Sequence, residues 1–141
     1  MAFLYTRTVR FQETDAAGVV FFANTLTACH EAYEASLMAA GVDVRLLFGG
    51  AAAGGRTIAL PIVHAEADYL RPAHCGDRHE IELTPTLQSE HAFVIQYVTF
   101  EGEHRDKPVS RALTRHFCIE TKSRQRQPLP SDILDWINQW R

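Results

Sequence analysis

Residues 24–40 read NTLTACHEAYEASLMAA and carry a long helical pattern. Residues three or four positions apart lie on one face of such a helix, and here that face consists of Leu26, His30, Tyr33, Leu37 and Ala40. Asn24 can cap the start of this helix, and Gly41 can end it. Because the remaining polar strip is narrow, we expect the helix to be largely enclosed by the rest of the fold.

Extended segments lie on both sides of this helix. The segment before it, Phe3 to Glu13, alternates apolar and polar residues, as a strand with one solvated face does. Runs rich in β-branched and aromatic residues follow it, at Thr57 to Leu70, Arg78 to Gln88, His91 to Glu101 and Pro108 to Glu120. The connections between the last three runs are too short for crossover helices, so we expect antiparallel neighbours. Pro85 cannot donate a ladder hydrogen bond, which predicts an edge or a bulge at that point.

This order of elements predicts an α+β fold in which one sheet buries one face against one long helix. After Pro130, the tail has Ser131 as a cap and an apolar face, which predicts a short C-terminal helix docked on the body. That face consists of Ile133, Trp136, Ile137 and Trp140. The run from His91 to Glu101 is apolar on both faces, so we expect a second subunit to cover the outer face and the protein to be a homo-oligomer.

The composition is that of one globular domain, residues 1–141. Of the 141 residues, 46% are hydrophobic, and 14 basic against 17 acidic residues give a net charge of -3. That balance argues against a disordered chain and against a nucleic-acid partner. The sequence has neither an apolar run of ~20 residues nor a secretory signal pattern, so we expect no membrane partner and a cytoplasmic location. Cys29, Cys75 and Cys118 are odd in number and widely spaced, which predicts reduced thiols.

The segment that joins the first strand to the helix carries one carboxylate among apolar neighbours; it reads TDAAGVVFFAN at residues 14–24. Asp15 lies a few residues before a helix N-terminus, whose unpaired N–H groups and dipole suit developing negative charge. A carboxylate there can attack a thioester carbonyl or activate a water molecule, while a backbone N–H holds the oxyanion. A purely structural role is also open, because Asp15 can cap the turn before Gly18.

Other catalytic patterns in the sequence are weak. It has no Gly-x-Ser-x-Gly elbow, which argues against a serine hydrolase of the α/β type. Cys29 and His30 are neighbours on the helix and point about 100° apart, so we expect Cys29 to pack rather than to act as a nucleophile. His74, Cys75 and His79 lack a fourth ligand at a regular spacing, so we expect no metal and no other cofactor.

Several of these segments, taken with their spacing, resemble the 4-hydroxybenzoyl-CoA thioesterase branch of the hotdog-fold superfamily. They are residues 14–24, Glu31-Ala32, Asp68-Tyr69-Leu70-Arg71-Pro72 and Cys75-Gly76-Asp77. The resemblance runs from about Tyr5 to Glu120. Within that branch, residues 29–34, 60–65 and 72–77 look most like the 1,4-dihydroxy-2-naphthoyl-CoA thioesterases of cyanobacteria and plants, which serve phylloquinone (vitamin K1) synthesis.

The resemblance implies a five-stranded antiparallel sheet wrapped around one long central helix, dimers that pair into tetramers, and active sites at the subunit interface. Asp15 falls on the family's catalytic aspartate, which acts as a nucleophile or as a general base. The backbone N–H of Phe22 falls near the oxyanion donor; related enzymes carry Tyr or His there, so this chain lacks that polar side chain. Glu31 matches a glutamate common in the family, and it either orients water or is an ordinary helix carboxylate.

The implied substrate is an aryl-CoA thioester, in the first place 1,4-dihydroxy-2-naphthoyl-CoA. His64 is the first candidate partner for the ring hydroxyls, and it shares one face of its strand with Glu66 and Asp68; a position in solvent or at a subunit interface is the alternative. The aromatic walls would come from Phe21, Phe22, Phe48 and Tyr69. The cations available for the CoA phosphates are Arg71, Arg111, Arg115, Lys122, Arg124 and Arg126.

Two other functions fit the same residues. The first is a fatty acyl-CoA or acyl-carrier-protein thioesterase that uses the same Asp15. Pocket shape distinguishes this substrate class from aryl-CoA thioesters, and the sequence does not show pocket shape. The second is a module that binds an acyl thioester or a partner without hydrolysing it.

Overall fold

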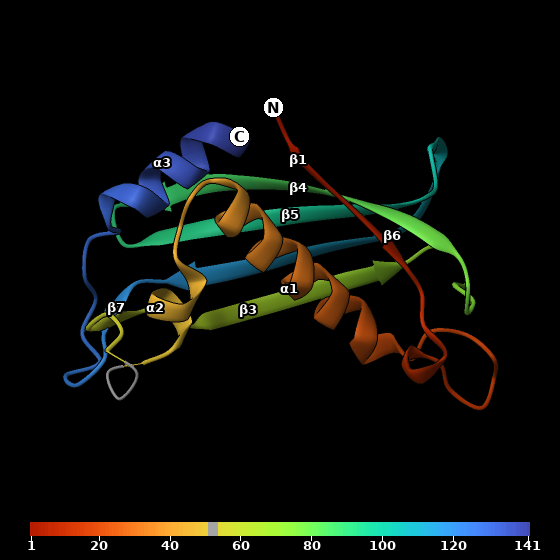
Figure 1. Cartoon of the computed structure of the whole chain (residues 1–141), viewed down its shortest axis with the longest axis horizontal. Coiled ribbons are helices and arrows are strands. Elements are labelled where there is room, and N and C mark those ends of the chain that lie inside the picture. Colours follow the sequence, from red (N-terminus) through yellow and green to blue (C-terminus); the bar gives the residue numbers. More distant parts are fainter. Residues whose placement is uncertain (51–53) are drawn as a thin grey trace.

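In the computed structural model, which describes residues 1–50 and 54–141, a five-stranded antiparallel sheet curves around one side of a long helix (Figure 1). The helices are α1 (Phe22–Ala39), α2 (Val44–Phe48) and α3 (Ser131–Trp140), and a 3-10 turn, η1, covers Phe11–Glu13. The strands are β1 (Phe3–Thr8), β2 (Ile58–Ala59), β3 (Ile62–Tyr69), β4 (Arg78–Ser89), β5 (Ala92–Glu101), β6 (His104–Phe117) and β7 (Ile119–Glu120). The large sheet has the order β1-β4-β5-β6-β3, and β2 pairs with β7. The predicted α+β fold, with one long helix and a short C-terminal helix, is confirmed.

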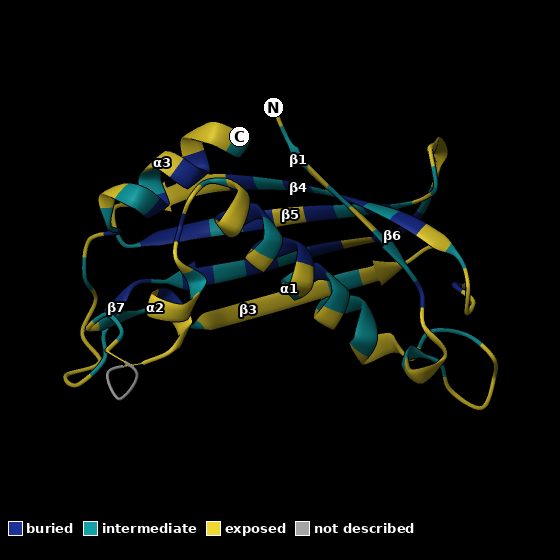
Figure 2. Cartoon of the chain, viewed as in Figure 1, coloured by how far each residue is buried: buried dark blue, intermediate teal, exposed yellow. Residues whose placement is uncertain are grey.

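Helix α1 buries one side only. Its buried residues are Cys29, Ala32, Tyr33, Ser36 and Leu37. The buried face shares Tyr33 and Leu37 with the predicted face but is rotated slightly around the helix from it. The opposite side, which includes Glu31 and Glu34, is exposed (Figure 2). The expectation that this chain encloses the helix is therefore wrong, because the sheet covers one side of it and leaves the other side open.

The ends of α1 differ in how well the sequence predicted them. Phe21, not Asn24, is the N-cap, and Asn24 instead lies in the first turn, where its side-chain nitrogen donates to the Glu13 carbonyl at 2.8 Å. Gly41 follows the helix with φ +83°, a conformation that glycine adopts without a steric penalty. The predicted C-terminal end is confirmed.

The inner face of the sheet forms the core with α1. On β5, Phe93, Ile95 and Tyr97 are buried, whereas Val94 and Val98, on the outer face, stay partly exposed. This is the alternation expected of a strand whose two faces are both apolar. In the described part of the chain, none of the helices combines the length and hydropathy that a bilayer crossing requires.

Three strand boundaries differ from the prediction. The first strand ends at Thr8, because the chain turns into η1 rather than continuing to Glu13. The run from Thr57 to Leu70 is divided before β3 by Pro61, which has no N–H for a ladder, and its first part pairs with β7. The run predicted from Pro108 to Glu120 starts earlier, since β6 begins at His104 and leaves a tighter turn after β5. It is also divided after Phe117, and its last part, β7, pairs with β2 outside the large sheet.

The prediction for Pro85 is confirmed. The pairing of β1 with β4 ends at Phe3 and Leu83, so Pro85 lies beyond β1, and in the described part of the chain its paired strand is β5. A proline is accommodated there because no strand needs its missing N–H.

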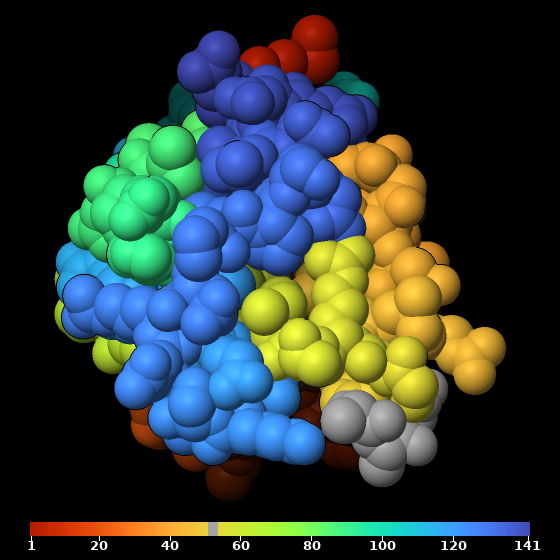
Figure 3. Space-filling model, turned by 90° about the vertical axis from the view of Figure 1, so that its left-hand side faces the viewer, coloured from red at the N-terminus to blue at the C-terminus, as the bar shows by residue number. Residues whose placement is uncertain are grey.

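Helix α3 covers one end of the sheet, and Figure 3 shows the C-terminal segment lying across this end of the molecule. Pro130 is the N-cap and Ser131 is the first helical residue, so the predicted serine cap is one residue out of register. Trp136 is fully buried, and its Nε1 donates to Ser36 Oγ of α1 at 2.9 Å. The predicted docking of this helix is confirmed, and it depends on a buried aromatic side chain whose polar atom has a partner.

A polar chain runs through the core beside α1. Thr114 Oγ1 lies 2.8 Å from His116 Nε2 and 3.3 Å from the Tyr97 hydroxyl. The His116 ring is stacked on Phe93, with 4.6 Å between centroids. Burial lowers the pKa of His116 from 6.5 to about 4, so this imidazole is neutral at physiological pH.

We predict that His116 makes the fold sensitive to acid. Because its folded pKa lies below its unfolded pKa, the stability it contributes is complete above about pH 6.5 and is lost as the pH falls toward about 4. Between about pH 7 and about pH 5, His116 alone should reduce the free energy of unfolding by about 2 kcal/mol. Urea unfolding of wild type and His116→Gln at both pH values measures this loss.

The variant should show the smaller pH dependence, by about that amount. Burial also lowers the pKa of His79, which contributes in the same direction but is present in both proteins and cancels in the comparison. Equal pH dependence in the two proteins would contradict the assignment to His116.

Candidate functional site

A groove of about 440 Å³ opens between the start of α1 and the end of β3. The predicted site residues that line it are Asp15, Phe21, Phe22, Tyr69 and Arg71. Most of the remaining wall is apolar, with Val19, Val20, Leu70, Pro72, Ala73 and Val109. A mostly apolar groove with a few polar groups is the usual form of a small-molecule site.

Asp15 lies at the start of a tight turn that its own side chain stabilises. Its Oδ1 accepts a hydrogen bond from the Ala17 N–H at 2.9 Å, and its carbonyl accepts one from Gly18 at 3.0 Å. Gly18 has φ +81°, which the turn requires. The other carboxylate oxygen, Oδ2, has no hydrogen-bond partner within residues 1–50 and 54–141. The turn therefore fixes the carboxylate through one oxygen and leaves the second free to react in the groove.

The start of α1 supplies an N–H group beside this carboxylate. Phe22 is the first residue of the helix, and its N–H has no acceptor among the described residues. The first N–H groups of a helix carry the positive end of its dipole. An unpaired N–H of this kind, in the wall of an apolar groove, can stabilise an oxyanion.

Tyr69 and Arg71 form the opposite wall of the groove. The Tyr69 hydroxyl donates to the carbonyl of Phe22 at 2.8 Å, which ties the end of β3 to the start of α1. The Arg71 N–H donates to the Val109 carbonyl at 3.1 Å, which holds the chain after β3 against β6. The Arg71 guanidinium is exposed and has no ion-pair partner in the described ranges, so it is available to an anionic ligand.

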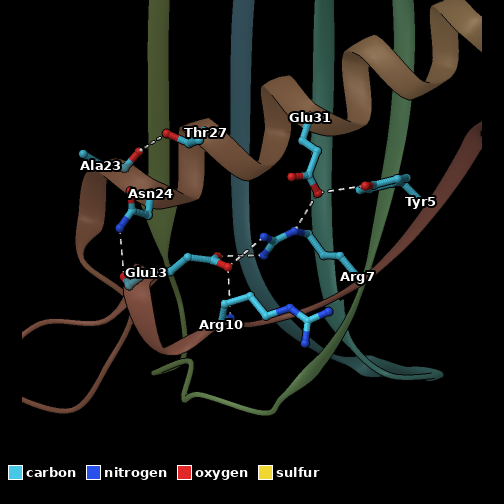
Figure 4. A network of polar contacts seen from close by, with 8 residues as sticks. All are labelled: Tyr5, Arg7, Arg10, Glu13, Ala23, Asn24, Thr27 and Glu31. Atoms are coloured by element: carbon cyan, nitrogen blue, oxygen red, sulfur yellow. Dashed lines mark hydrogen bonds and ion pairs between the residues drawn. The ribbon is translucent and has the colours of Figure 1, made fainter.

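Glu31 lies outside the groove, in a polar network on the side of α1 that faces β1 (Figure 4). Its Oε2 accepts hydrogen bonds from the Tyr5 hydroxyl at 2.8 Å and from Arg7 Nε at 3.0 Å. Arg7 also pairs with both carboxylate oxygens of Glu13, each at 2.8 Å. Burial raises the pKa of Glu13, but hydrogen bonds from Arg7 and from the Arg10 N–H outweigh it and hold this pKa below its usual range. All three charged side chains are thus paired with opposite charge.

Phe48 also lies outside this groove. Its ring, on α2, packs near His30 and Tyr33 of α1, with centroids 6.2 and 6.0 Å away. Helix α2 lies next to the start of β3, whereas the groove lies at the end of β3 (Figure 1). The structure therefore separates Phe48 from Asp15 along the length of β3.

His64 points away from α1, on the outer face of the sheet. The register of β3 with β6 confirms that His64, Glu66 and Asp68 share one face, and His64 Nε2 lies 3.6 Å from Glu66 Oε2. The face that carries Ala67 and Tyr69 is the one turned toward the helix. The structure does not bring His64 to the groove.

The remaining predicted cations are dispersed. Arg111 is on the outer face of the sheet, and Arg115 lies four residues further along β6 on the same face. Lys122, Arg124 and Arg126 follow β7, at the end of the molecule opposite the groove (Figure 1). Among the predicted phosphate ligands, Arg71 is the one that lines the groove.

The cysteine and histidine side chains favour neither a thiol nucleophile nor a metal site in the described part of the chain. Burial raises the pKa of Cys29 to about 12, so its thiol stays protonated, and the predicted packing role is confirmed. Across residues 1–50 and 54–141, no three His, Cys, Asp or Glu side chains are placed to hold one metal ion. His74 instead lies 3.8 Å from Asp77, in its own turn.

Sequence reasoning missed Arg7, Glu13 and Asn24, which connect the Asp15 turn to the rest of the fold. The signal was present at Arg7, which follows Phe3 and Tyr5 on the helix-facing side of β1. A charged residue on an inward face needs a charged or polar partner. Which partner it finds depends on how η1 folds back on β1, and that is a property of the tertiary structure.

The model of the thioesterase-like superfamily matches residues 9–137, which include every element from η1 to most of α3. The chain belongs to the thioesterase-like superfamily. Its fold is the hotdog fold that the sequence resemblance implied.

The thioesterase-like chain has close relatives with a named activity. A 1,4-dihydroxy-2-naphthoyl-CoA hydrolase from Synechococcus elongatus is 47% identical over 133 residues, which cover 94% of this chain and 93% of the relative. One from Acaryochloris marina is 43% identical over 137 residues, covering 97% and 96%. The crystal structure of a 1,4-dihydroxy-2-naphthoyl-CoA thioesterase from Synechocystis superposes with a TM-score of 0.88 at 39% identity, over 98% of this chain and 96% of that one.

We predict that Gly18→Ala disturbs the Asp15 turn and leaves the rest of the fold intact. At φ +81° a β-carbon has no close neighbour, so the penalty is conformational and should lower the free energy of unfolding by about 1 kcal/mol. The altered turn should also slow thioester hydrolysis, measured beside urea unfolding. Gly102→Ala is the matched control, because Gly102 has φ +57° in the β5–β6 turn, outside the groove. Equal activity in both variants would show that the Gly18 turn does not set the position of Asp15.

Proposed function

We propose that this thioesterase-like protein hydrolyses 1,4-dihydroxy-2-naphthoyl-CoA to 1,4-dihydroxy-2-naphthoate and CoA, a step of phylloquinone (vitamin K1) biosynthesis. The observation that carries the proposal is the free Oδ2 of Asp15 in an apolar groove whose wall also holds the unpaired Phe22 N–H. The named activity of relatives 43% and 47% identical over almost the whole chain supports the choice of acyl group.

The groove supports either of two roles for Asp15. As a nucleophile, Oδ2 bonds to the thioester carbon, the thiolate of CoA leaves, and water then hydrolyses the acyl anhydride. As a general base, Oδ2 takes a proton from water, the water oxygen attacks the same carbon, and the proton passes to the leaving thiolate. In both, the Phe22 N–H holds the oxyanion, and the products are a carboxylate and free CoA.

The walls of the groove suit an aryl group with a CoA tail. Phe21 and Tyr69 offer aromatic faces to a bicyclic ring, and the Phe22 ring lies 4.7 Å from that of Phe21. Arg71, at the rim, would pair with a CoA phosphate. A water-soluble CoA thioester fits a reaction in the cytoplasm, with no metal or other cofactor needed for these steps.

A second copy of the chain would complete the site. Strand β3 is the last strand of the sheet, and its outer edge has no partner strand in the described chain. An unpaired edge is a template for another strand. If two copies pair antiparallel along β3, the start of one strand meets the end of the other. That arrangement would place Phe48 of the partner subunit, which lies beside the start of its β3, near this chain's Tyr69 and Asp15.

We propose that this pairing gives the dimer, and that dimers associate through the outer face of the sheet into a tetramer. That outer face carries partly exposed apolar side chains, among them Val94, Val98 and Leu113. Because His64 is on this face, its proposed place is at or near a contact between dimers rather than beside the ring hydroxyls.

The activity is tested with wild type and Asp15→Asn on 1,4-dihydroxy-2-naphthoyl-CoA, benzoyl-CoA and a medium-chain acyl-CoA. The asparagine side-chain oxygen still accepts the Ala17 N–H, so the turn persists while the reacting oxygen is lost. We expect a preference for the naphthoyl substrate and a fall in kcat of about 100-fold or more in the variant. Loss of thioester absorbance is the readout, because a thiol dye would also react with the exposed Cys75.

Each other result changes a specific part of the proposal. A preference for the medium-chain substrate with the same loss in Asp15→Asn would keep the site and replace the acyl group. Full activity in Asp15→Asn would overturn the role of Asp15. Binding of the thioester without turnover by wild type would make the protein a binding module.

The dimer is tested with Val63→Lys, which puts a charge at the start of the free β3 edge, where Val63 is 48% exposed. We expect wild type to sediment as a dimer or tetramer, and the variant to shift toward monomer and lose activity. Leu87→Lys is the matched control, since Leu87 is also 48% exposed but lies at the far end of β4. A wild-type monomer with full activity would contradict a site shared between two chains.

A further inference from the structure

The segment that carries Asp15 is held by polar contacts, with little help from apolar burial. Between β1 and α1 the chain forms η1 and the Asp15 turn, and η1 has no buried residue. Phe11, its largest apolar side chain, is 80% exposed. Since apolar packing contributes little here, hydrogen bonds and ion pairs must set where the turn lies.

Glu13 makes several of those contacts, alongside the bridge between Thr14 and Val20 and the Val20 N–H, which donates to the Ala73 carbonyl at 2.8 Å. The Glu13 carboxylate takes the paired hydrogen bonds from Arg7, and Oε2 also accepts the Arg10 N–H at 3.0 Å. Its backbone carbonyl accepts the Phe21 N–H at 2.9 Å and the Asn24 side chain at 2.8 Å. One residue thus binds β1 through its side chain and the start of α1 through its backbone.

Glu13 is close in sequence to Asp15 and contacts the residue before Phe22, so the way it is held affects both groups of the proposed site. Glu13 is two residues before Asp15, and Phe21 is one residue before the free N–H of Phe22. The distance between the proposed reacting carboxylate and the oxyanion donor therefore depends in part on how Glu13 is held. Displacing a reacting group by about 1 Å is enough to lower a rate about 100-fold.

Arg7 is held in turn by Glu31. The side chains of Arg7 and Glu13 are each only 13% exposed, and Arg7 reaches Glu31 with its Nε (Figure 4). Tyr5 donates to the same Oε2 of Glu31 that Arg7 uses. The Arg7 guanidinium is thus held by Glu31 at Nε and by Glu13 at its two terminal nitrogens. The two terminal nitrogens keep the planar, paired geometry that a carboxylate prefers.

We propose that Arg7, Glu13 and Glu31 are a positioning network for the thioesterase site: they hold the Asp15 turn at a fixed place relative to the Phe22 N–H. Glu31 is then a positioning residue that acts through Arg7, and not a group that touches the substrate. The inference rests on the proposed function, because it assigns these residues to the placement of Asp15.

The network is tested by a double-mutant cycle of Arg7→Gln, Glu13→Gln and the two together, with kcat, KM and melting temperature measured for each. Gln at position 13 keeps the backbone carbonyl that holds Phe21, so the fold should survive this change. We expect kcat to fall about 10- to 100-fold in Arg7→Gln, with KM changed by less than about threefold. The double variant should be no more than about threefold slower than Arg7→Gln, because the pair acts as a unit.

Arg105→Gln is the matched control. Arg105 also bridges two carboxylates, those of Glu80 and Glu82, both at 2.7 Å, but on the outer face of the sheet. We expect Arg105→Gln to lower the melting temperature only slightly, as loss of a surface ion pair does, and to leave kcat unchanged. If Arg7→Gln and Glu13→Gln fold and keep kcat within about threefold of wild type while Asp15→Asn is inactive, the positioning network is overturned and the site stands. If Asp15→Asn is fully active, the proposed function itself fails.

The role of Glu31 is tested separately by the pH profile of kcat in Glu31→Gln. The amide oxygen can still accept from Tyr5 and Arg7, so we expect a loss of less than about tenfold and an unchanged acid limb of the profile. Glu31→Ala, which removes the acceptor, should resemble Arg7→Gln in kcat. Loss of the acid limb in Glu31→Gln would instead make Glu31 a group that exchanges protons in the reaction, and would overturn its assignment as a positioning residue.

Discussion

Burial of one side of α1 against the curved sheet is the constraint on which the rest of this structure depends. Tyr33 and Leu37 fill the inner face of the sheet, and Ser36, on the same side, accepts the Trp136 Nε1 of α3. Burial of this side sets the rotation of the helix about its axis, and the contact of Ser36 with Trp136 sets its direction along the sheet. Its C-terminal half lies under α3, and its N-terminus lies at the open end of the sheet, where β3 also ends (Figure 1). The groove is a consequence of that direction, because the first turn of α1 has the end of β3 as its neighbour.

The end of the molecule that carries Asp15 is held together by different interactions from those in the core. The core is apolar, with a short polar chain through His116 whose members satisfy one another. The Asp15 turn is exposed and is held by hydrogen bonds and ion pairs to Glu13 and to its own backbone. Directional contacts of this kind can fix a carboxylate to within a fraction of an ångström, which apolar packing of an exposed loop cannot do. They also leave one oxygen of Asp15 and the N–H of Phe22 without a hydrogen-bond partner among the residues that the structure describes.

The exposed side of α1 and the unpaired edge of β3 are the two features behind the proposed dimer. One side of the helix is exposed, the edge of β3 has no partner in the described chain, and Phe48 is on the end of the molecule away from the groove. An antiparallel pair of chains along β3 would account for all three together, since it covers the edge and brings the two ends of the strand face to face. The proposed pairing would also explain why Phe48 does not lie beside Asp15 of its own chain.

The sequence by itself determined the class of fold, the main elements and the position of the carboxylate proposed to react. Periodicity identified α1, the long strands and the apolar face of α3, because helices and strands repeat at different intervals whatever surrounds them. It also marked Pro85 as an edge residue, since a missing N–H is a local property. It failed at Asn24, at Ser131 and at the ends of the first and last long strands, where one or two backbone hydrogen bonds decide the boundary.

What only the tertiary structure decided is how residues far apart in the chain meet. The pairing of Arg7 with Glu13 and Glu31, and the contact of Tyr69 with the start of α1, join segments whose separation in sequence gives no sign of their distance in space. The inward or outward direction of His64 was likewise fixed by the register of β3 with β6, because a shift of one residue in a strand reverses every side chain. Local sequence therefore made Asp15 a candidate for the reacting group, and the packing of α1 on the sheet decided which groups surround it.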